Sequence, residues 1–260
     1  MRMKQKGINH FSGKCVWVIG ASSGIGQACA AALFAAGANV AISGRRTEQL
    51  SQLANSASAD QVLILPLDVT NESQITQAHQ QILERWGNLD LLLFVSGMYV
   101  PMRANELDVT LVEKTINTNL LGPMRAVATV LPAMLKKHEG HIAIVGSVAG
   151  YSGLPKALAY GPSKAGIINF CETLYYDLLP QGVSVHMISP GFVATEATAQ
   201  NDFEMPALMT PEQAAKEIIQ GIKDGKFDIH FPKRFSGFLK LLRILPYPLY
   251  FWIVRRFVNI

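Results

Sequence analysis

Short apolar segments alternate with longer segments of helical pattern along most of the chain, and this alternation limits the folds available to it. The apolar segments are CVWVIG, NVAIS, QVLILPL, LDLLLFVS, HIAIVGS, VSVHMIS and FDIHF. They are apolar on both faces, as the strands of a parallel sheet are when helices cover both of its sides. The intervening segments 24–36, 47–56, 71–86, 108–137, 158–179 and 211–223 are long enough for crossover helices. We therefore predict an α/β fold with a doubly wound, mostly parallel sheet of about seven strands.

The same pattern predicts a single domain over residues 1–231, followed by a helical tail over residues 232–260. The chain has 260 residues, 49% of them apolar, which suffices for one sizeable core. The segment TPEQ at 210–213 predicts a helix start, with Thr210 as N-cap, Pro211 in the first position and Gln213 completing a capping box.

Composition and charge exclude several classes of protein. The cysteines, Cys15, Cys29 and Cys171, are scattered without a CxxC pair, so we expect no disulfide framework, no metal site and a reducing, cytoplasmic compartment. The longest apolar runs are far shorter than the roughly 20 residues that span a bilayer, and the start of the chain lacks a signal-peptide pattern. The net charge is +4, but six cations follow Asp228 without an acid, and the residues before them sum to −2. This distribution argues against nucleic-acid binding.

A glycine-rich turn follows the first predicted strand. The sequence GASSGIG, residues 20–26, leads into the Ala-rich segment QACAAALFAAG. Glycines let a turn tighten and approach a pyrophosphate, and the helix that follows offers free N–H groups. No Gly-Lys-Ser/Thr follows, which excludes a Walker A loop. The pattern predicts a dinucleotide site of the Rossmann type.

The residues after the second predicted strand favour one form of this dinucleotide. An NAD site usually has a carboxylate here, whereas this chain has Arg45 and Arg46 and no acid before Glu48. A guanidinium can form two charge-assisted hydrogen bonds with a 2′-phosphate. We therefore predict NADP(H); the alternative is a solvated basic pair at the start of a surface helix.

Tyr160 lies four positions before Lys164, which places the two side chains on one face of a helix. A nearby positive charge favours the phenolate and lowers the pKa of a tyrosine toward neutrality. Such a tyrosine can act as a general acid or base. The alternative is an ordinary exposed helix pair.

Together these motifs resemble the short-chain dehydrogenase/reductase family over residues 12–231. GASSGIG resembles the glycine motif of the family, LDV at 67–69 its adenine-contacting segment, NTNLLG its active-site asparagine segment, GSVAG its catalytic serine segment and SPGFVAT its nicotinamide-side loop. Ser147 precedes Tyr160 by the 13 residues typical of the family. The resemblance implies catalytic roles for Ser147, Tyr160, Lys164 and Asn119. It implies that the cofactor contacts Gly20, Ser22, Ser23, Gly24, Ile25, Gly26, Arg45, Arg46, Asp68, Val69, Gly97, Tyr160, Lys164, Pro190, Gly191, Val193 and Thr195.

The resemblance also implies a mechanism. NADPH would deliver a hydride to a carbonyl carbon, while Tyr160 donates a proton to the carbonyl oxygen and Ser147 hydrogen-bonds it. Lys164 would lower the pKa of Tyr160 and hold the nicotinamide ribose, and Asn119 would anchor a water that relays protons. The chain departs from the family at residues 94–97, where Phe-Val-Ser-Gly replaces the usual Asn-Asn-Ala-Gly, and at Ile19, where a threonine is usual.

The segments expected on the substrate side are apolar, with Arg103 as the only obvious cation. They favour a lipophilic ketone or aldehyde; the alternative for these segments is ordinary packing of a lid. The residues concerned are Met98, Tyr99, Met102, Tyr151, Leu154, Phe192, Phe203, Met205 and Leu208. Oxidation of an alcohol and a non-catalytic redox sensor are alternative functions.

The tail combines basic, aromatic and amphipathic sequence. On a helical wheel, Phe235, Phe238, Leu239, Leu242 and Leu245 share one face, and Lys233, Lys240 and Arg243 share the opposite one. Pro246 and Pro248 end this helix, and LYFWIV follows before Arg255 and Arg256. This pattern favours a helix in a membrane interface; the alternatives are a cap over the substrate cleft and packing on a second subunit. By the resemblance we also expect a homo-oligomer, dimer or tetramer, formed through 108–137 and 158–179.

Overall fold

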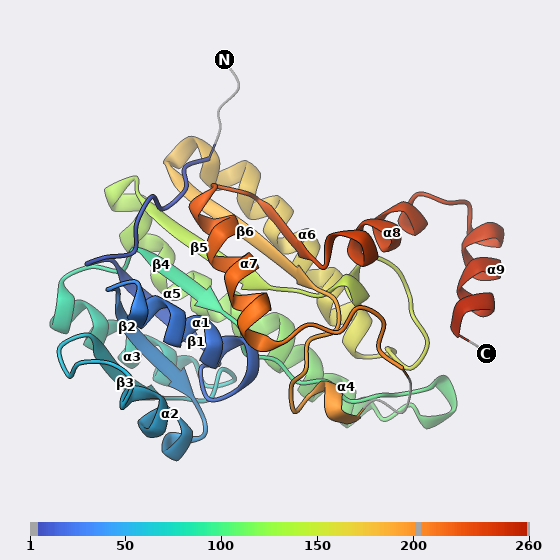
Figure 1. Cartoon of the computed structure of the whole chain (residues 1–260), viewed down its shortest axis with the longest axis horizontal. Helices are drawn as coiled ribbons and strands as arrows, with labels where there is room; N and C mark the ends of the chain where they lie inside the picture. Colours follow the sequence, from blue (N-terminus) through green and yellow to red (C-terminus); the bar gives the residue numbers. More distant parts are fainter. Residues whose placement is uncertain (1–4, 201–203, 259–260) are drawn as a thin grey trace.

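The computed structural model describes residues 5–200 and 204–258. Its centre is a seven-stranded, fully parallel sheet with the strand order β3-β2-β1-β4-β5-β6-β7 (Figure 1). The strands are β1 (Cys15–Ile19), β2 (Asn39–Gly44), β3 (Val62–Pro66), β4 (Leu91–Phe94), β5 (Gly140–Val145), β6 (Val183–Pro190) and β7 (Asp228–Phe231). All seven apolar segments of the sequence therefore form strands, and the predicted doubly wound α/β fold is confirmed.

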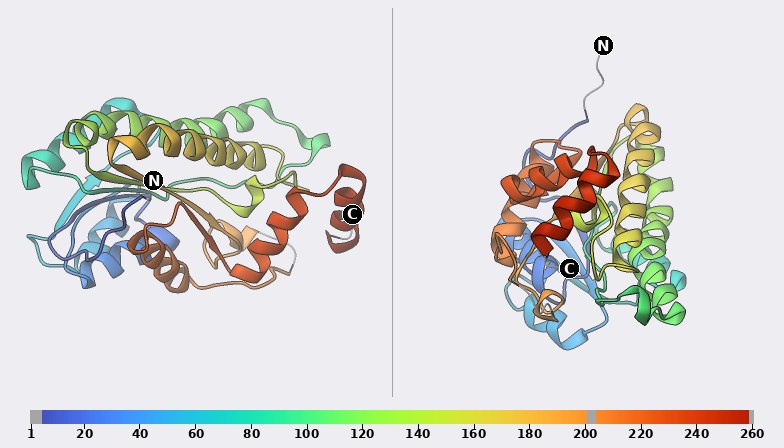
Figure 2. Two further views of the ribbon diagram at one scale, coloured as in Figure 1. Left: turned by 90° about the horizontal axis from the view of Figure 1, so that it is seen from above. Right: turned by 90° about the vertical axis from the view of Figure 1, so that its right-hand side faces the viewer.

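Helices cover both faces of the sheet (Figure 2). On one face lie α1 (Gly24–Ala35), α2 (Thr47–Ala54) and α7 (Pro211–Lys223), and on the other α3 (Glu72–Trp86), α5 (Gly122–Lys137) and α6 (Tyr160–Leu178). Successive side chains along each strand point to opposite faces of the sheet, and so toward opposite helix layers. In β1, Val16 and Val18 pack in the first core, and Trp17 and Ile19 pack in the second. This two-sided burial explains why both faces of β1 are apolar; the edge strand β7, in contrast, has Asp228 and His230 on a half-buried face.

The helix boundaries follow local sequence signals. The Thr210 side chain accepts a hydrogen bond from the Gln213 backbone, and the Gln213 side chain accepts one from Thr210, so the predicted capping box forms. The segment 108–137, predicted as helical, divides into α4 (Val109–Ile116), one π-helical turn (Asn117–Leu121) and α5. A π turn widens the backbone locally and often marks a functional position.

The chain order of the strands reverses beside β1. The chain moves outward from β1 to β2 and β3, then returns to β4 on the other side of β1. In such sheets, ligands bind outside the carboxyl ends of the strands at this point. The fold therefore places a candidate site above β1 and β4.

Two further helices, α8 (Lys233–Arg243) and α9 (Tyr247–Val258), follow β7 and lie beyond the carboxyl ends of the strands (Figures 1 and 2). An ion pair between Lys240 and Asp228 holds α8 on the body. The Tyr250 hydroxyl of α9 donates a hydrogen bond to the Gly153 carbonyl. No helix within the described ranges is long and apolar enough to cross a membrane.

Candidate active site

A cavity of about 2050 Å³ opens at the carboxyl ends of the strands. All but two of the predicted cofactor-binding and catalytic residues line it; Gly26 and Asn119 do not. Its wall draws on the glycine turn, the loops after β2, β3, β4, β5 and β6, and the helices α8 and α9. The fold thus brings together residues that lie far apart in the sequence.

The glycine turn forms one end of the cavity because its backbone packs too closely for side chains. Gly20 has a φ of +100°, and a Cβ there would lie 2.5 Å from the Ser96 nitrogen. Gly26 lies beneath the turn, where a Cβ would be 2.0 Å from the Gly20 carbonyl oxygen. Gly26 therefore supports the turn rather than lining the cavity. The first turn of α1 begins at Gly24 and presents its backbone N–H groups to the cavity.

Arg46 lies between two walls of the cavity. Its guanidinium donates two hydrogen bonds to the Glu196 carboxylate, at 2.9 and 2.8 Å, and one to the Ser23 hydroxyl at 2.5 Å. Glu196 belongs to the loop after β6 and was not among the predicted site residues. No local sequence pattern could predict this contact, because 150 residues separate Arg46 from Glu196.

Asp68, predicted to contact the adenine, lines the cavity in the loop after β3. It accepts hydrogen bonds from the backbone and the hydroxyl of Thr70 at 2.9 and 2.8 Å. These bonds, together with the charge of Arg45, lower the pKa of Asp68, while partial burial opposes them. Asp68 is therefore a hydrogen-bond acceptor at neutral pH, beside Val69 in the cavity wall.

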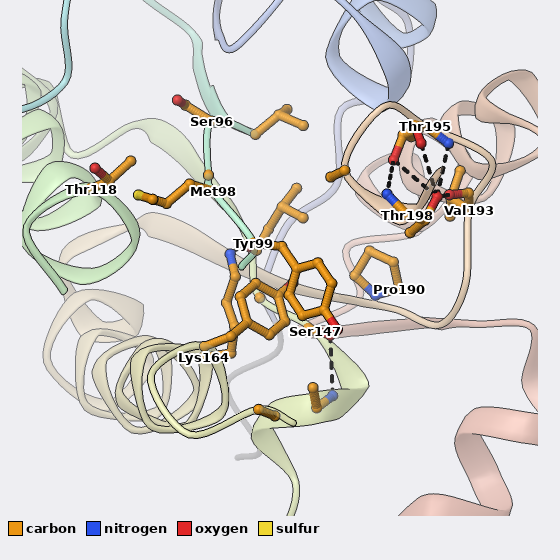
Figure 3. A pocket seen from close by; sticks show the side chains of 18 of the residues that line it. Ser96, Met98, Tyr99, Thr118, Ser147, Lys164, Pro190, Val193, Thr195 and Thr198 are labelled. Carbon is orange, nitrogen blue, oxygen red and sulfur yellow. Dashed lines mark hydrogen bonds between the residues drawn. The ribbon is translucent and has the colours of Figure 1, made fainter. Parts of the chain in front are cut away.

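The catalytic candidates meet where α6 begins. Tyr160 is the first residue of α6, and Lys164 follows one turn later, with its Nζ 5.7 Å from the centroid of the Tyr160 ring. Ser147 precedes a 3-10 turn (Val148–Gly150) that packs on α6, since a Cβ at Gly150 would lie 2.6 Å from the Lys164 carbonyl carbon. This contact holds Ser147 within hydrogen-bonding reach of Tyr160. Ser147, Lys164 and Tyr99 point into the same part of the cavity (Figure 3).

The protonation state of this pair differs from the expectation. The Lys164 ammonium is buried and donates a hydrogen bond to the Val145 carbonyl at 2.9 Å. Burial lowers the pKa of Lys164 to about 8. Removal from water also raises the pKa of Tyr160, and the hydrogen bond with Ser147 offsets only part of this rise. The predicted lowering of the Tyr160 pKa by Lys164 is not found, because desolvation of the phenol is the larger effect.

Asn119 braces the loop after β4 from the π turn. Its Oδ1 accepts a hydrogen bond from the Met98 backbone N–H, and its Nδ2 donates one to the Met98 carbonyl, both at 2.8 Å. Nδ2 also donates to the Ser163 hydroxyl at 3.2 Å. This side chain is buried, so it positions the loop around Gly97 and Lys164. Ser163 was not among the predicted site residues, although its place three residues after Tyr160 puts both on the same face of α6.

The loop after β6 closes the far side of the cavity. Pro190, Gly191, Val193 and Thr195 all line the cavity. The Thr198 hydroxyl donates to the Val193 carbonyl at 2.6 Å and accepts from the Thr195 backbone at 3.0 Å (Figure 3). These bonds hold Thr195 against the first turn of α1, where a Cβ at Gly24 would lie 2.9 Å from its methyl carbon.

The predicted substrate side is only partly as expected. Met98, Tyr99, Leu154 and Phe192 line the cavity, whereas Met102, Tyr151, Met205 and Leu208 do not, and Phe203 lies outside the described residues. Lys156, two residues after Leu154, also lines the cavity, so Arg103 is not the only cation among these segments, contrary to the prediction from the sequence. The tail completes this side with a set of apolar residues: Phe235, Phe238, Leu239, Leu242, Ile253 and Val254.

Comparisons with known proteins agree with this geometry. The family model described as short chain dehydrogenase matches residues 14–205. An uncharacterized oxidoreductase of Myxococcus xanthus is 36% identical over 241 residues, which cover 92% of this chain and 95% of that protein. An uncharacterized oxidoreductase of Staphylococcus aureus is 30% identical over 209 residues, covering 80% and 90%.

Solved structures share the fold. A short chain dehydrogenase/reductase from Burkholderia phymatum in complex with NAD superposes with a TM-score of 0.82 at 22% identity, covering 90% of this chain and 94% of that one. ElxO with NADP bound superposes with a TM-score of 0.76 at 25% identity, covering 84% and 97%. The structural neighbours therefore include one complex with NAD and one with NADP.

Proposed function

The chain belongs to the short-chain dehydrogenase family, and we propose that it uses NADPH to reduce the carbonyl group of a hydrophobic ketone or aldehyde. The observation that carries the proposal is the single cavity that unites the glycine turn, Arg46, Tyr160 and an apolar wall from the tail. These parts correspond to a dinucleotide site, a proton donor and a lipophilic substrate site.

The cavity has the features that a dinucleotide requires. The close approach at Gly20 leaves the backbone bare beside the start of α1, where a pyrophosphate can accept N–H hydrogen bonds. Arg46 would hold a 2′-phosphate through its planar guanidinium, and Asp68 would face the adenine. Lys164 would hold the nicotinamide ribose. NADPH, when bound, supplies the hydride.

The residues of the chain manage the proton. The raised pKa keeps the Tyr160 phenol protonated at neutral pH, and a protonated phenol is the form that donates to a carbonyl oxygen. The Ser147 hydroxyl stabilises the negative charge that develops on that oxygen. Lys164, with a pKa of about 8, is charged at neutral pH and lies next to the phenol. Carbonyl reduction begins with the protonated phenol, whereas alcohol oxidation begins with the phenolate as a base.

NADPH consumption with ketones and aldehydes of increasing chain length tests the proposal. We expect turnover to rise with chain length and to fall by about 10²–10⁴-fold in Tyr160→Phe. The matched control is Tyr176→Phe, which removes the same hydroxyl from an exposed position on α6 and leaves turnover unchanged. NADPH binding without reduction of any carbonyl would refute catalysis and favour a redox sensor.

A further inference from the structure

The outward side of α8 and α9 exposes large apolar side chains at the end of the molecule. Ile244, Tyr247 and Trp252 expose 76%, 75% and 65% of their surfaces. They belong to a set that we call the tail face: Leu241, Ile244, Tyr247, Leu249, Phe251 and Trp252. Both views of the fold place α9 at the extremity beyond the sheet, so a flat partner can reach it without meeting the body (Figures 1 and 2). Exposed apolar patches of this kind mark interaction surfaces.

Positive charge surrounds the tail face. Five cations of the two helices are exposed: Lys233, Arg234, Arg243, Arg255 and Arg256. The sixth, Lys240, binds Asp228, and no acidic residue follows Asp228 in the sequence. Aromatic and aliphatic side chains flanked by arginines match an anionic lipid surface, which offers negative headgroups above an apolar layer. From this complementarity we propose that the tail face docks the protein on an anionic bilayer.

A second copy of the chain fits this surface less well. In a twofold dimer built through the tail face, each copy would present the same patch, so the cations around one patch would meet the cations around the other. Like charges across an interface oppose association. A lipid surface brings the opposite charge, and it accommodates an apolar protrusion without needing a complementary shape.

The inward sides of the same helices line the catalytic cavity. Leu242 and Val254 are buried and face the cavity, while Leu241 and Trp252, one and two positions away in the chain, are exposed. Docking would therefore place the bilayer next to the substrate wall. If the proposed function holds, on which this step rests, the substrate is a membrane-resident carbonyl compound that enters from the lipid side.

Co-sedimentation of the full chain with vesicles tests the docking without any reaction. The probes are vesicles of phosphatidylcholine alone and vesicles that contain about one third phosphatidylglycerol. We expect at least about tenfold stronger binding to the anionic vesicles, weakened by added salt. Equal binding to both kinds of vesicle, or binding to neither, overturns the proposal.

Two double variants locate the contact. Ile244→Ser/Trp252→Ser is expected to weaken binding at least about tenfold, whereas Leu107→Ser/Tyr176→Ser, exposed apolar residues on other elements, leaves it unchanged. Arg255→Gln/Arg256→Gln is expected to lose the preference for anionic vesicles, and Lys136→Gln/Lys216→Gln, with the same change in net charge, to keep it. NADPH affinity checks that each variant is folded.

Three results would overturn the assignment of this face. The first is that Ile244→Ser/Trp252→Ser binds anionic vesicles as strongly as wild type, and the second is that the control variants lose as much vesicle affinity as the tail-face variants. The third is that sedimentation velocity shows the wild type as a dimer and Ile244→Ser/Trp252→Ser as a monomer. The proposed function is measured separately with a water-soluble ketone and no vesicles. If the protein reduces this ketone but does not bind vesicles, the proposed function is supported and the proposed docking is refuted.

Discussion

The contact between Arg46 and Glu196 leads to a prediction about cofactor preference. The guanidinium that would pair with a 2′-phosphate already binds the Glu196 carboxylate through two hydrogen bonds of 2.9 and 2.8 Å. Glu196 and a 2′-phosphate would therefore compete for one cation. Replacing this carboxylate by an amide, as in Glu196→Gln, should release Arg46 and tighten the binding of NADPH.

The size of the effect follows from the exposure of the pair. The Arg46 and Glu196 side chains expose 38% and 70% of their surfaces, and exposed ion pairs contribute about 0–1 kcal/mol. Both bonds to Glu196 leave one nitrogen, Nη1, so we take about 1 kcal/mol as the upper value for this pair, which corresponds to about fivefold in Kd at most. NADH carries no 2′-phosphate, so its Kd should change by less than about twofold. Arg46→Gln removes the cation itself and should weaken NADPH binding about 10–100-fold, as expected for hydrogen bonds to a charged group.

The assay is a fluorescence titration of both reduced cofactors into wild type, Glu196→Gln and Arg46→Gln. The control is Glu204→Gln, because Glu204 lines the same cavity and its change removes the same charge. We expect the control to affect NADPH and NADH alike. A Glu196→Gln variant with equal changes for both cofactors would show that general charge, rather than Arg46, is responsible. An unchanged cofactor ratio in Arg46→Gln would refute the assignment of the 2′-phosphate site.

Two further predictions concern stability. Gly20→Ala should lower the free energy of unfolding, measured in urea, by more than about 2 kcal/mol. The reason is that Gly20 has a positive φ and that a Cβ there would lie 2.5 Å from the Ser96 nitrogen. The control is Gly153→Ala, which has open space around it and should stay within about 0.5 kcal/mol of wild type. Acid should destabilise the protein through His141 on β5 and His186 on β6, whose Nδ1 and Nε2 atoms, respectively, are 3.1 Å apart. Burial lowers the pKa of His141 to about 3 and that of His186 to about 4, so the unfolded chain binds protons first as the pH falls below about 6.5. Their stabilising contribution is complete above that pH and declines toward the folded pKa values, by on the order of 2 kcal/mol per histidine at about pH 5. Urea midpoints at pH 7 and 5 measure the loss, and His186→Gln should reduce it; equal pH sensitivity in this variant would contradict the assignment.

The sheet could be predicted from the sequence because the residue types within each strand indicate how deeply that strand is buried. The segment VSVHMIS lies in β6, whose eight residues are all buried, including the polar Ser184 and His186. The glycine turn was equally readable, since the close contacts of Gly20 and Gly26 admit no other residue. These features depend on local chemistry and on one layer of packing.

Other features depend on contacts that no local pattern encodes. The pairing of Arg46 with Glu196 and of Asn119 with the Met98 backbone arises only when distant loops meet at the carboxyl ends of the strands. The pKa of Tyr160 depends on how much water the finished cavity excludes, so the charge of Lys164 alone gave the wrong direction. The sequence also indicated an apolar face on α8 without indicating what it covers.

That apolar face explains how the tail can serve two purposes. Phe235, Phe238 and Leu239 line the cavity, so under the proposed function the body would hold the dinucleotide and the tail would complete the substrate side. The surface that remains exposed, from Leu241 to Trp252, is a separate set of residues on the same two helices. The exposed set and the cavity-lining set are held together, because α8 and α9 share the small core of Leu242, Tyr250 and Val254. Substrate choice and location in the cell would then depend on one short segment, while the hydride and proton chemistry depends on the rest of the chain.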